Sequence, residues 1–255
     1  MKHQIKLSQP ETSTSPALAV SGLCVSYPGR PNVLRDTNLR VLPGERVGLI
    51  GPNGGGKTTF FLAVCGVLEP AAGEIVLFGK PVAVGEFRPE IGLVFQNPYD
   101  QLFCPSVRDD VAFGPQNMGL SPEEVEARVT EALSITGVQA LADRAPHNLS
   151  GGEKSMVAIA GVLAMRPRLV LYDEPSANLD LRARRRLIRF LQESKETILI
   201  SSHDLELILE VCDRVILMDE QHIVADGNPR EVMGDEKLMK AHGLEKPHSL
   251  VFHNE

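Results

Sequence analysis

Residues Glu45–Leu68 read ERVGLIGPNGGGKTTFFLAVCGVL, and no other stretch of the chain constrains its architecture so strongly. The apolar run before Gly51 predicts a strand, and the apolar residues of Lys57–Leu68 recur at helical spacing ahead of Pro70. Between them, Gly51–Thr58 matches G-x-x-x-x-G-K-[ST] in the strand–loop–helix context that this motif requires. The alternative, a Gly-rich turn with an exposed lysine, does not account for this agreement of motif and context.

The chemistry of this loop points to a nucleoside triphosphate. Glycines let successive backbone N–H groups turn toward phosphate oxygens, and the helix that begins near Lys57 adds its dipole. Lys57 can then reach the β- and γ-phosphates, and the Thr58 hydroxyl can bind Mg²⁺. The predicted phosphate-binding residues are Asn53, Gly54, Gly55, Gly56, Lys57, Thr58 and Thr59.

A second chemical signal is the pair of acids that follows the apolar strand Leu169–Tyr172. Parallel α/β sheets place their ligands at the carboxyl ends of strands, so Asp173 and Glu174 are expected near the loop. Adjacent side chains on a strand diverge, and the two acids therefore have different predicted roles. Asp173 is expected to hold Mg²⁺ beside Thr58, and Glu174 to orient or deprotonate the attacking water. The alternative is two acids in a turn before Pro175.

The remaining pattern predicts an α/β fold. Two N-terminal segments that mix polar and β-branched residues predict an antiparallel layer, and two wholly apolar segments predict parallel strands buried on both faces. Pro98–Gly119 has no clear period, but Ser121 caps a predicted helix that Gly137 ends, so the middle of the chain is a mainly helical insert. The predicted strands are Leu18–Tyr27, Val33–Val41, Glu45–Ile50, Glu74–Phe78, Ile91–Phe95, Leu169–Tyr172, Thr197–Ile200 and a hairpin of Arg214–Met218 with Ile223–Ala225.

Composition excludes several classes of protein. The 33 acidic and 26 basic residues give a formal charge of −7, which argues against general nucleic-acid binding. The longest apolar run, Met156–Met165, is about half of a membrane span, and Met1–Pro16 lacks the apolar region of a secretory signal, so a cytoplasmic location is expected. The cysteines have no metal-finger spacing and are predicted to be buried thiols: Cys24, Cys65, Cys104 and Cys212.

Ser150-Gly151-Gly152-Glu153 has the local chemistry of a capping box at the start of a helix, whose N-terminus could also receive a phosphate. Together with the loop and the acid pair, these four residues resemble the signature of ATP-binding cassette (ABC) ATPases, and the resemblance covers about residues 17–230. It implies a head-to-tail dimer, in which Ser150, Gly151 and Gly152 of one chain face the ATP held by Lys57 of another. A monomer is then expected to hydrolyse ATP slowly.

The same resemblance implies further roles. Tyr27 would stack on adenine, Gln96 would link Mg²⁺ and the attacking water to a membrane partner, and His203 would contact the γ-phosphate. Asn178–Asp180 would touch the opposite subunit. Taken alone, Tyr27 could be an ordinary strand aromatic and His203 a structural histidine.

A narrower resemblance is carried by Phe95–Phe103, Asp109–Pro115 and Gly161–Pro167, which look like the ATPase subunits of energy-coupling-factor importers, especially of the cobalt and nickel type. In such subunits the segment after Gln96 receives the membrane partner's coupling helices. The acids in this region could pair with basic residues of that partner or could be solvated loop acids: Asp100, Asp109 and Asp110.

Four positions depart from the common ABC pattern. Glu153 stands where Gln is usual and Met156 where Arg is common, which puts an ion pair or ribose contact in doubt. Gly55 replaces a commoner Ala or Ser, and Asn178 a commoner Gly or Ala. None of them removes a predicted phosphate, metal or water ligand.

The sequence therefore predicts a P-loop NTPase core with an N-terminal antiparallel β part and an inserted helical subdomain at about 97–155. The ABC domain spans 17–230, between a flexible tail at 1–16 and an appendage at 231–255. The arginines of 182–189 are interpreted as a solvated helix face and not a nucleic-acid patch.

The predicted function is ATP hydrolysis at the cytoplasmic face of the cell membrane. A homodimer, or a heterodimer with a related ATPase, would bind ATP and Mg²⁺ and drive uptake of cobalt or nickel through separate membrane subunits, with no nucleic acid as partner. A vitamin importer and an ABC ATPase acting on nucleic acid remain alternatives. A GTP-driven switch would need an N-K-x-D motif, which the sequence lacks.

Overall fold

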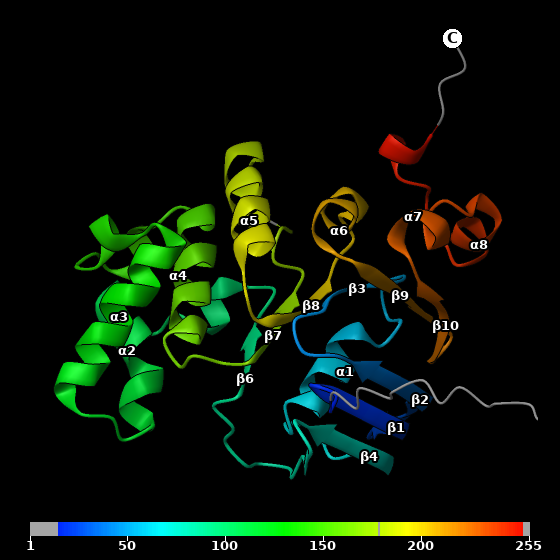
Figure 1. Cartoon of the computed structure of the whole chain (residues 1–255), viewed down its shortest axis with the longest axis horizontal. Coiled ribbons are helices and arrows are strands. Elements are labelled where there is room, and N and C mark those ends of the chain that lie inside the picture. Colours follow the sequence, from blue (N-terminus) through cyan, green and yellow to red (C-terminus); the bar gives the residue numbers. More distant parts are fainter. Residues whose placement is uncertain (1–14, 178, 252–255) are drawn as a thin grey trace, which may run out of the picture.

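The computed structural model describes residues 15–177 and 179–251, which form two β-sheets with helices around them (Figure 1). The larger sheet has the strand order β10-β9-β3-β8-β7-β6, and all of its neighbouring strands are parallel except β10 and β9. Its strands are β3 (Arg46–Ile50), β6 (Ile91–Val94), β7 (Leu169–Asp173), β8 (Thr197–Ser201), β9 (Arg214–Asp219) and β10 (His222–Gly227).

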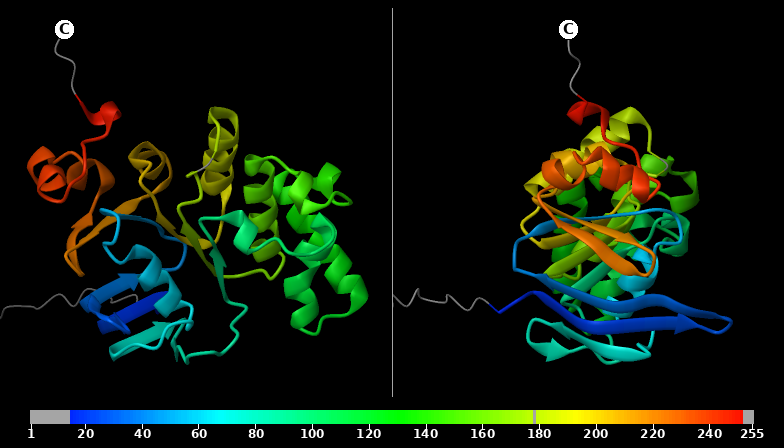
Figure 2. Two further views of the ribbon diagram at one scale, coloured as in Figure 1. Left: turned by 180° about the vertical axis from the view of Figure 1, so that it is seen from behind. Right: turned by 90° about the vertical axis from the view of Figure 1, so that its right-hand side faces the viewer.

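Both faces of this sheet are covered, which explains why its central strands are apolar throughout. Every residue of β7 and β8 is buried. Helices α5 and α6 lie on one face, and α1 with the smaller sheet lies on the other (Figures 1 and 2). The helices outside the insert are α1 (Lys57–Val64), α5 (Leu181–Glu193), α6 (Leu205–Val211), α7 (Pro229–Val232) and α8 (Glu236–Ala241).

The smaller sheet is antiparallel and comes mostly from the N-terminal part of the chain. Its order is β2-β1-β4-β5, from β1 (Leu18–Tyr27), β2 (Arg30–Val41), β4 (Ala72–Leu77) and β5 (Lys80–Pro81). Helix α1 packs between the two sheets, because Phe60 and Phe61 are fully buried in a cluster that holds residues of both. This packing fixes the start of α1 beside the end of β3.

A group of three helices lies beyond β6 at the edge of the larger sheet (Figure 1). They are α2 (Val107–Asn117), α3 (Pro122–Thr136) and α4 (Gly151–Leu163), with short 3-10 turns at Pro98–Asp100, Gln139–Leu141 and Pro146–Asn148. A further 3-10 turn, His248–Leu250, follows α8. Ser121 accepts a hydrogen bond from the Glu124 N–H, and Gly137 ends α3 in the left-handed conformation, as the sequence predicts.

The predicted α/β fold with its antiparallel part is confirmed, and most predicted strands agree within two residues. The helix predicted over Lys57–Leu68 is shorter and ends at Val64, because Gly66 and Val67 donate to carbonyl groups of the last turn in a Schellman arrangement. The strand predicted from Val33 begins at Arg30, since Tyr27 pairs directly with Arg30 across a tight turn.

One expectation is refined and another is wrong. The helical insert includes α2 within Pro98–Gly119, a stretch without a clear period, because Gly114 packs closely on Met165 and Pro115 is unusual inside a helix. Burial of all four thiols is wrong: Cys212 is buried, but the other three are partly exposed, and all four are free. Among residues 15–177 and 179–251, no helix is both long enough and apolar enough to span a bilayer.

Candidate active site

The loop between β3 and α1 needs glycine for reasons of space as well as conformation. Gly51 has φ 147°, and a Cβ there would lie 2.0 Å from the carbonyl oxygen of Met218. Gly56 has φ 95°, and a Cβ would lie 2.6 Å from a methyl group of Leu34. The departure at Gly55 has the same cause, since a Cβ would meet the Met218 oxygen at 2.9 Å. The Met218 carbonyl group and the Leu34 side chain therefore leave no room for a larger residue at these three positions.

Lys57 is buried at the first position of α1. Its Nζ donates hydrogen bonds to the carbonyl oxygens of Gly51 (2.8 Å) and Pro52 (3.1 Å), so the ammonium group lies over the loop. Burial lowers the pKa of Lys57, and the nearby carboxylates of Glu174 and Asp173 oppose that change. The site thus keeps a cation where phosphate charge would arrive.

Asp173 connects the loop to the sheet. The Thr58 hydroxyl donates to its Oδ2 (2.7 Å), and the Ser201 hydroxyl donates to its Oδ1 (2.5 Å). The second contact follows from register, because Asp173 and Ser201 are paired at the ends of β7 and β8. A hydroxyl and a carboxylate oxygen are hard donors of the kind that Mg²⁺ binds, so these residues fit that ion.

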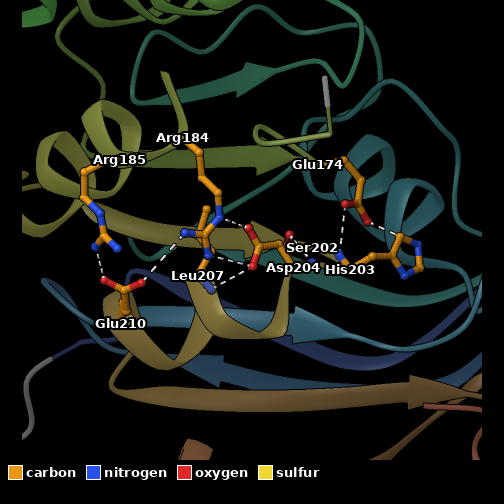
Figure 3. Close-up of polar contacts among 8 residues, drawn as sticks. All are labelled: Glu174, Arg184, Arg185, Ser202, His203, Asp204, Leu207 and Glu210. Carbon is orange, nitrogen blue, oxygen red and sulfur yellow. Dashed lines mark hydrogen bonds and ion pairs between the residues drawn. The ribbon is translucent and has the colours of Figure 1, made fainter. Parts of the chain in front are cut away.

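Glu174 is held in an unusual backbone conformation. It has φ 47°, a region that costs a non-glycine residue about 1–3 kcal/mol. Its N–H donates to both the carbonyl oxygen (3.0 Å) and the hydroxyl oxygen (3.1 Å) of Ser201, which offsets that cost. The residue is only 7% exposed, and its Oε2 accepts a hydrogen bond from the His203 N–H at 3.0 Å (Figure 3).

The other oxygen of this carboxylate is poised for a further partner. Oε1 lies 3.3 Å from Nε2 of His203, yet among the described residues it has no hydrogen-bond partner. A buried carboxylate oxygen in this condition can accept a proton or a hydrogen bond from a ligand. Glu174 and His203 therefore act as one polar unit beside Asp173.

These groups share one cavity of about 150 Å³. It contains every predicted loop residue from Asn53 to Thr59, together with Gln96, Asp173, Glu174 and His203. It also contains Arg30 and Val33, which sequence reasoning missed. The sequence feature that could have predicted Arg30 is a basic residue close after Tyr27. The Arg30 guanidinium lies close to Gly54. No feature of the sequence predicts Val33 at this cavity.

Four predicted residues lie outside this cavity. Tyr27 is half-buried at the end of β1, where its hydroxyl forms a 3.2 Å hydrogen bond with that of Thr59. Ser150, Gly151 and Gly152 begin α4 in the helical group and do not line the cavity of the same chain. Asn178 lies outside the described residues.

The first turn of α4 satisfies its own polar groups. Ser150 is exposed and accepts a hydrogen bond from the Glu153 N–H, while Glu153 accepts from the Ser150 N–H, so the predicted capping box is confirmed. Gly152 packs against α5, since a Cβ there would lie 2.6 Å from Cβ of Ala183. Asp180 caps α5 by accepting from the Ala183 N–H at 2.7 Å.

Two arginines of α5, Arg184 and Arg185, form ion pairs with acids of α6 and of its N-cap (Figure 3). Arg184 donates to both oxygens of Asp204, and Arg185 pairs with Glu210. Burial raises the pKa of Asp204, but hydrogen bonds from Arg184 and from the Leu207 N–H outweigh it, and the pKa is lowered overall. Because Asp204 directly follows His203, this pairing anchors the segment that carries the histidine.

The fold, the phosphate loop and the acids at the end of β7 define a P-loop NTPase. The family model for the ABC transporter matches residues 34–177, and the chain belongs to the ABC transporter family as one of its ATPases.

Several relatives refine the comparison. A putative ABC transporter ATP-binding protein of Synechocystis is 57% identical over 235 residues, which are 92% of this chain and 83% of that protein. The energy-coupling factor transporter ATP-binding protein EcfA of Methanothermobacter thermautotrophicus is 47% identical over 233 residues, covering 88% of this chain and 75% of that protein.

A solved structure gives the same result. The structure of cbiO1 from Clostridium perfringens, described as part of the ABC transporter complex cbiONQ, has a TM-score of 0.79 and 37% sequence identity, covering 89% of this chain and 94% of that one. These relatives agree with the resemblance to energy-coupling-factor ATPases that the sequence motifs indicate.

Proposed function

We propose that this chain is the ATP-hydrolysing subunit of an energy-coupling-factor importer, which takes up a cobalt or nickel ion through separate membrane subunits. The observation that carries the ATPase assignment is the buried Glu174, held by Ser201 and His203 next to the Thr58–Asp173 contact in the phosphate-loop cavity. The names of the EcfA and cbiO1 relatives support the transporter class.

The chain's own groups suit in-line attack of water on the γ-phosphate. Backbone N–H groups of the loop would bind the phosphates, and Lys57 would exchange the carbonyls of Gly51 and Pro52 for phosphate oxygens. Glu174 Oε1 would accept a hydrogen bond or a proton from the attacking water, while His203 contacts the γ-phosphate. Thr58 and Asp173 would hold Mg²⁺, which when bound neutralises phosphate charge.

The position of the signature supports a second copy of the fold as part of the site. Ser150 is exposed, lies outside the cavity of its own chain and stands at the N-terminus of α4, where the helix dipole would favour a phosphate. In the proposed head-to-tail dimer, Ser150, Gly151 and Gly152 of each chain face the ATP bound by the other. ATP binding closes this dimer and hydrolysis reopens it.

A separate groove suits the membrane subunits. It encloses about 530 Å³ between β6, α2 and α4, and exposed aromatic side chains line it: Phe87, Phe95, Phe103 and Phe113. An apolar groove with exposed aromatic residues is typical of surfaces that bind another protein. We propose that the coupling segment of the membrane partner docks here, adjacent to Gln96.

The three acids predicted to meet that partner have different surroundings. Asp109 accepts a hydrogen bond from the Ser106 hydroxyl at 2.6 Å in the cap of α2, and Asp100 is exposed at the groove. Asp110 is not a solvated loop acid: it is 8% exposed, and its Oδ1 accepts from the N–H groups of Phe103 and Cys104. Its buried Oδ2 has no hydrogen-bond partner among the described residues, and the residue borders the groove proposed for the partner.

The ATPase part of the proposal is tested with Glu174→Gln. This variant keeps the size of the side chain but loses the base, so ATP should still bind while turnover falls by about 10²–10⁴-fold. With ATP and Mg²⁺, the variant should sediment as a stable dimer, whereas ADP should leave it monomeric. Normal turnover would remove Glu174 from its proposed role.

The partner part is tested with Asp110→Asn, which keeps Oδ1 as acceptor for the two N–H groups but loses the charge. Copurification of the membrane subunits with the tagged chain should weaken about tenfold, while the ATPase activity of the isolated chain should not change.

Uptake assays on the intact complex with cobalt, nickel or vitamins distinguish the metal importer from a vitamin importer. Stimulation of turnover by nucleic acid would favour the nucleic-acid alternative.

A further inference from the structure

We infer that Glu153 is a positioning residue that competes with the γ-phosphate for the proton of the Ser150 hydroxyl, and so raises the ATP concentration needed to close the dimer. The inference rests on the proposed function, because only in that dimer does Ser150 meet a γ-phosphate. Glu153 is the position at which this chain departs from the usual glutamine of the signature.

The geometry shows where the hydroxyl proton lies. Ser150 Oγ donates to Oε2 of Glu153 at 2.7 Å, and the Ser150 N–H donates to the same oxygen at 2.8 Å. A serine hydroxyl has one proton to donate, and both a carboxylate and an ionised phosphate only accept. The Ser150 proton can therefore serve Glu153 or the γ-phosphate, but not both at once.

The charge on Glu153 strengthens this competition. Hydrogen bonds from the side chain and the backbone of Ser150 lower the pKa of Glu153, and the positive charges of Arg144 and Arg186 lower it further. An ionised acceptor makes hydrogen bonds roughly twice as strong as a neutral one. Glu153 also places a negative charge in the first turn of α4, at the helix end that would receive the phosphate.

Glutamine would relieve both effects without dismantling the helix start. Its amide oxygen can still accept from the Ser150 N–H, since Gln is as suitable as Glu in a capping box. Its neutral acceptor holds the hydroxyl proton less strongly and adds no charge beside the phosphate. Glu153→Gln is therefore expected to make dimer closure easier.

The chain offers a control in the first turn of α3. Glu123 stands two residues after the cap Ser121, one position earlier than Glu153 stands after Ser150, and hydrogen bonds from the backbone and then from the Ser121 side chain lower its pKa. Glu123→Gln makes the same chemical change at a helix start that is not part of the signature. It should alter helix capping but not the response to ATP.

The experiment measures dimerisation by sedimentation velocity against ATP concentration, with the full chain carrying Glu174→Gln so that ATP persists. Adding Glu153→Gln should lower the half-maximal ATP concentration about tenfold, whereas adding Glu123→Gln should leave it unchanged. The affinity for a fluorescent ADP should be the same in Glu174→Gln and in both double variants, because ADP has no γ-phosphate to compete with Glu153 for the Ser150 proton. With Glu174 intact, Glu153→Gln should lower the apparent KM for ATP without raising kcat.

An unchanged ATP midpoint in the Glu153→Gln protein would overturn the inference while leaving the proposed function in place. An equal gain in ADP affinity would also overturn it, since a general electrostatic effect would then replace the competition for the hydroxyl. If Glu174→Gln forms no dimer with ATP at all, the proposed function fails and the inference fails with it.

Discussion

The phosphate loop and the signature segment are both proposed to bind phosphate, but the structure holds their residues differently. At the loop, Lys57, Asp173 and Glu174 are buried, and each is hydrogen-bonded to backbone or to Ser201 within the same chain. At the signature, Ser150 is exposed and bonded only within its own helix turn. One half of the proposed site is therefore preorganised by the core, and the other half is presented to solvent. Such a division suits a reaction centre that is completed by a second chain.

The strongest test of this division mixes two inactive variants. Lys57→Ala removes the buried cation and Ser150→Ala removes the exposed hydroxyl, so each protein alone should lose about 10²-fold in turnover. In mixed dimers one of the two sites has both an intact loop and an intact signature. Turnover of the mixture should rise several-fold above that of either variant.

The control for this mixture is Lys57→Ala combined with a chain that carries both substitutions. No intact site can form in that pair, so turnover should stay at the level of the single variants. Full activity of Ser150→Ala by itself, or no recovery on mixing, would mean that each chain contains a complete site.

A smaller effect is expected at Ser201, which supports both acids of the preorganised half. Ser201→Ala leaves Asp173 Oδ1 without its hydroxyl donor and removes one acceptor of the Glu174 N–H. Turnover should fall about tenfold, and the free energy of unfolding should fall by about 1–3 kcal/mol. Steady-state kinetics and urea unfolding measure the two effects.

Ser202→Ala is the matched control, because this neighbour is equally buried but accepts from the Asp204 N–H and contacts neither acid. It should lower stability to a similar extent while turnover changes much less. If both alanine variants lose turnover equally, Ser201 has no special role in holding the acids.

The smallest effect is expected for the ion pair between Arg184 and Asp204, the residue that follows His203. Because the folded-state pKa of Asp204 is lowered, the pair contributes stability above the ordinary pKa of the carboxyl group, and that contribution is lost as pH falls through the folded-state value. Arg184→Gln should cost about 1 kcal/mol at pH 7, and this cost should shrink progressively as urea unfolding is repeated at pH values that fall through the folded-state pKa of Asp204. Arg185→Gln, on the more exposed neighbour, should cost less than half as much.

The sequence predicts the parts of this molecule that depend on local chemistry. The phosphate loop, the acids at the end of β7 and the capping box at Ser150 are short motifs whose residues act on their immediate neighbours, and the structure brings the loop and the acids into one cavity. The α/β fold follows from the same strand–loop–helix unit and from strands that are apolar on both faces.

What the sequence does not predict depends on contacts between distant segments. Arg30 reaches the cavity because β1 and β2 pair directly from Tyr27 onward, a register that the pattern does not specify. The burial of Asp110 follows from backbone donors at Phe103 and Cys104, which a list of acidic residues cannot reveal.

The close approach of Gly152 to Ala183 has a mechanical consequence. No side chain separates the start of α4 from the start of α5, so the two helices meet backbone to side chain at that point. A rotation of the helical group relative to the central sheet must either carry the first turn of α5 with it or open a gap there. Because Asp180 accepts from the Ala183 N–H, a movement of the signature that carried Ala183 with it would also strain the cap of α5, a few residues after the acids.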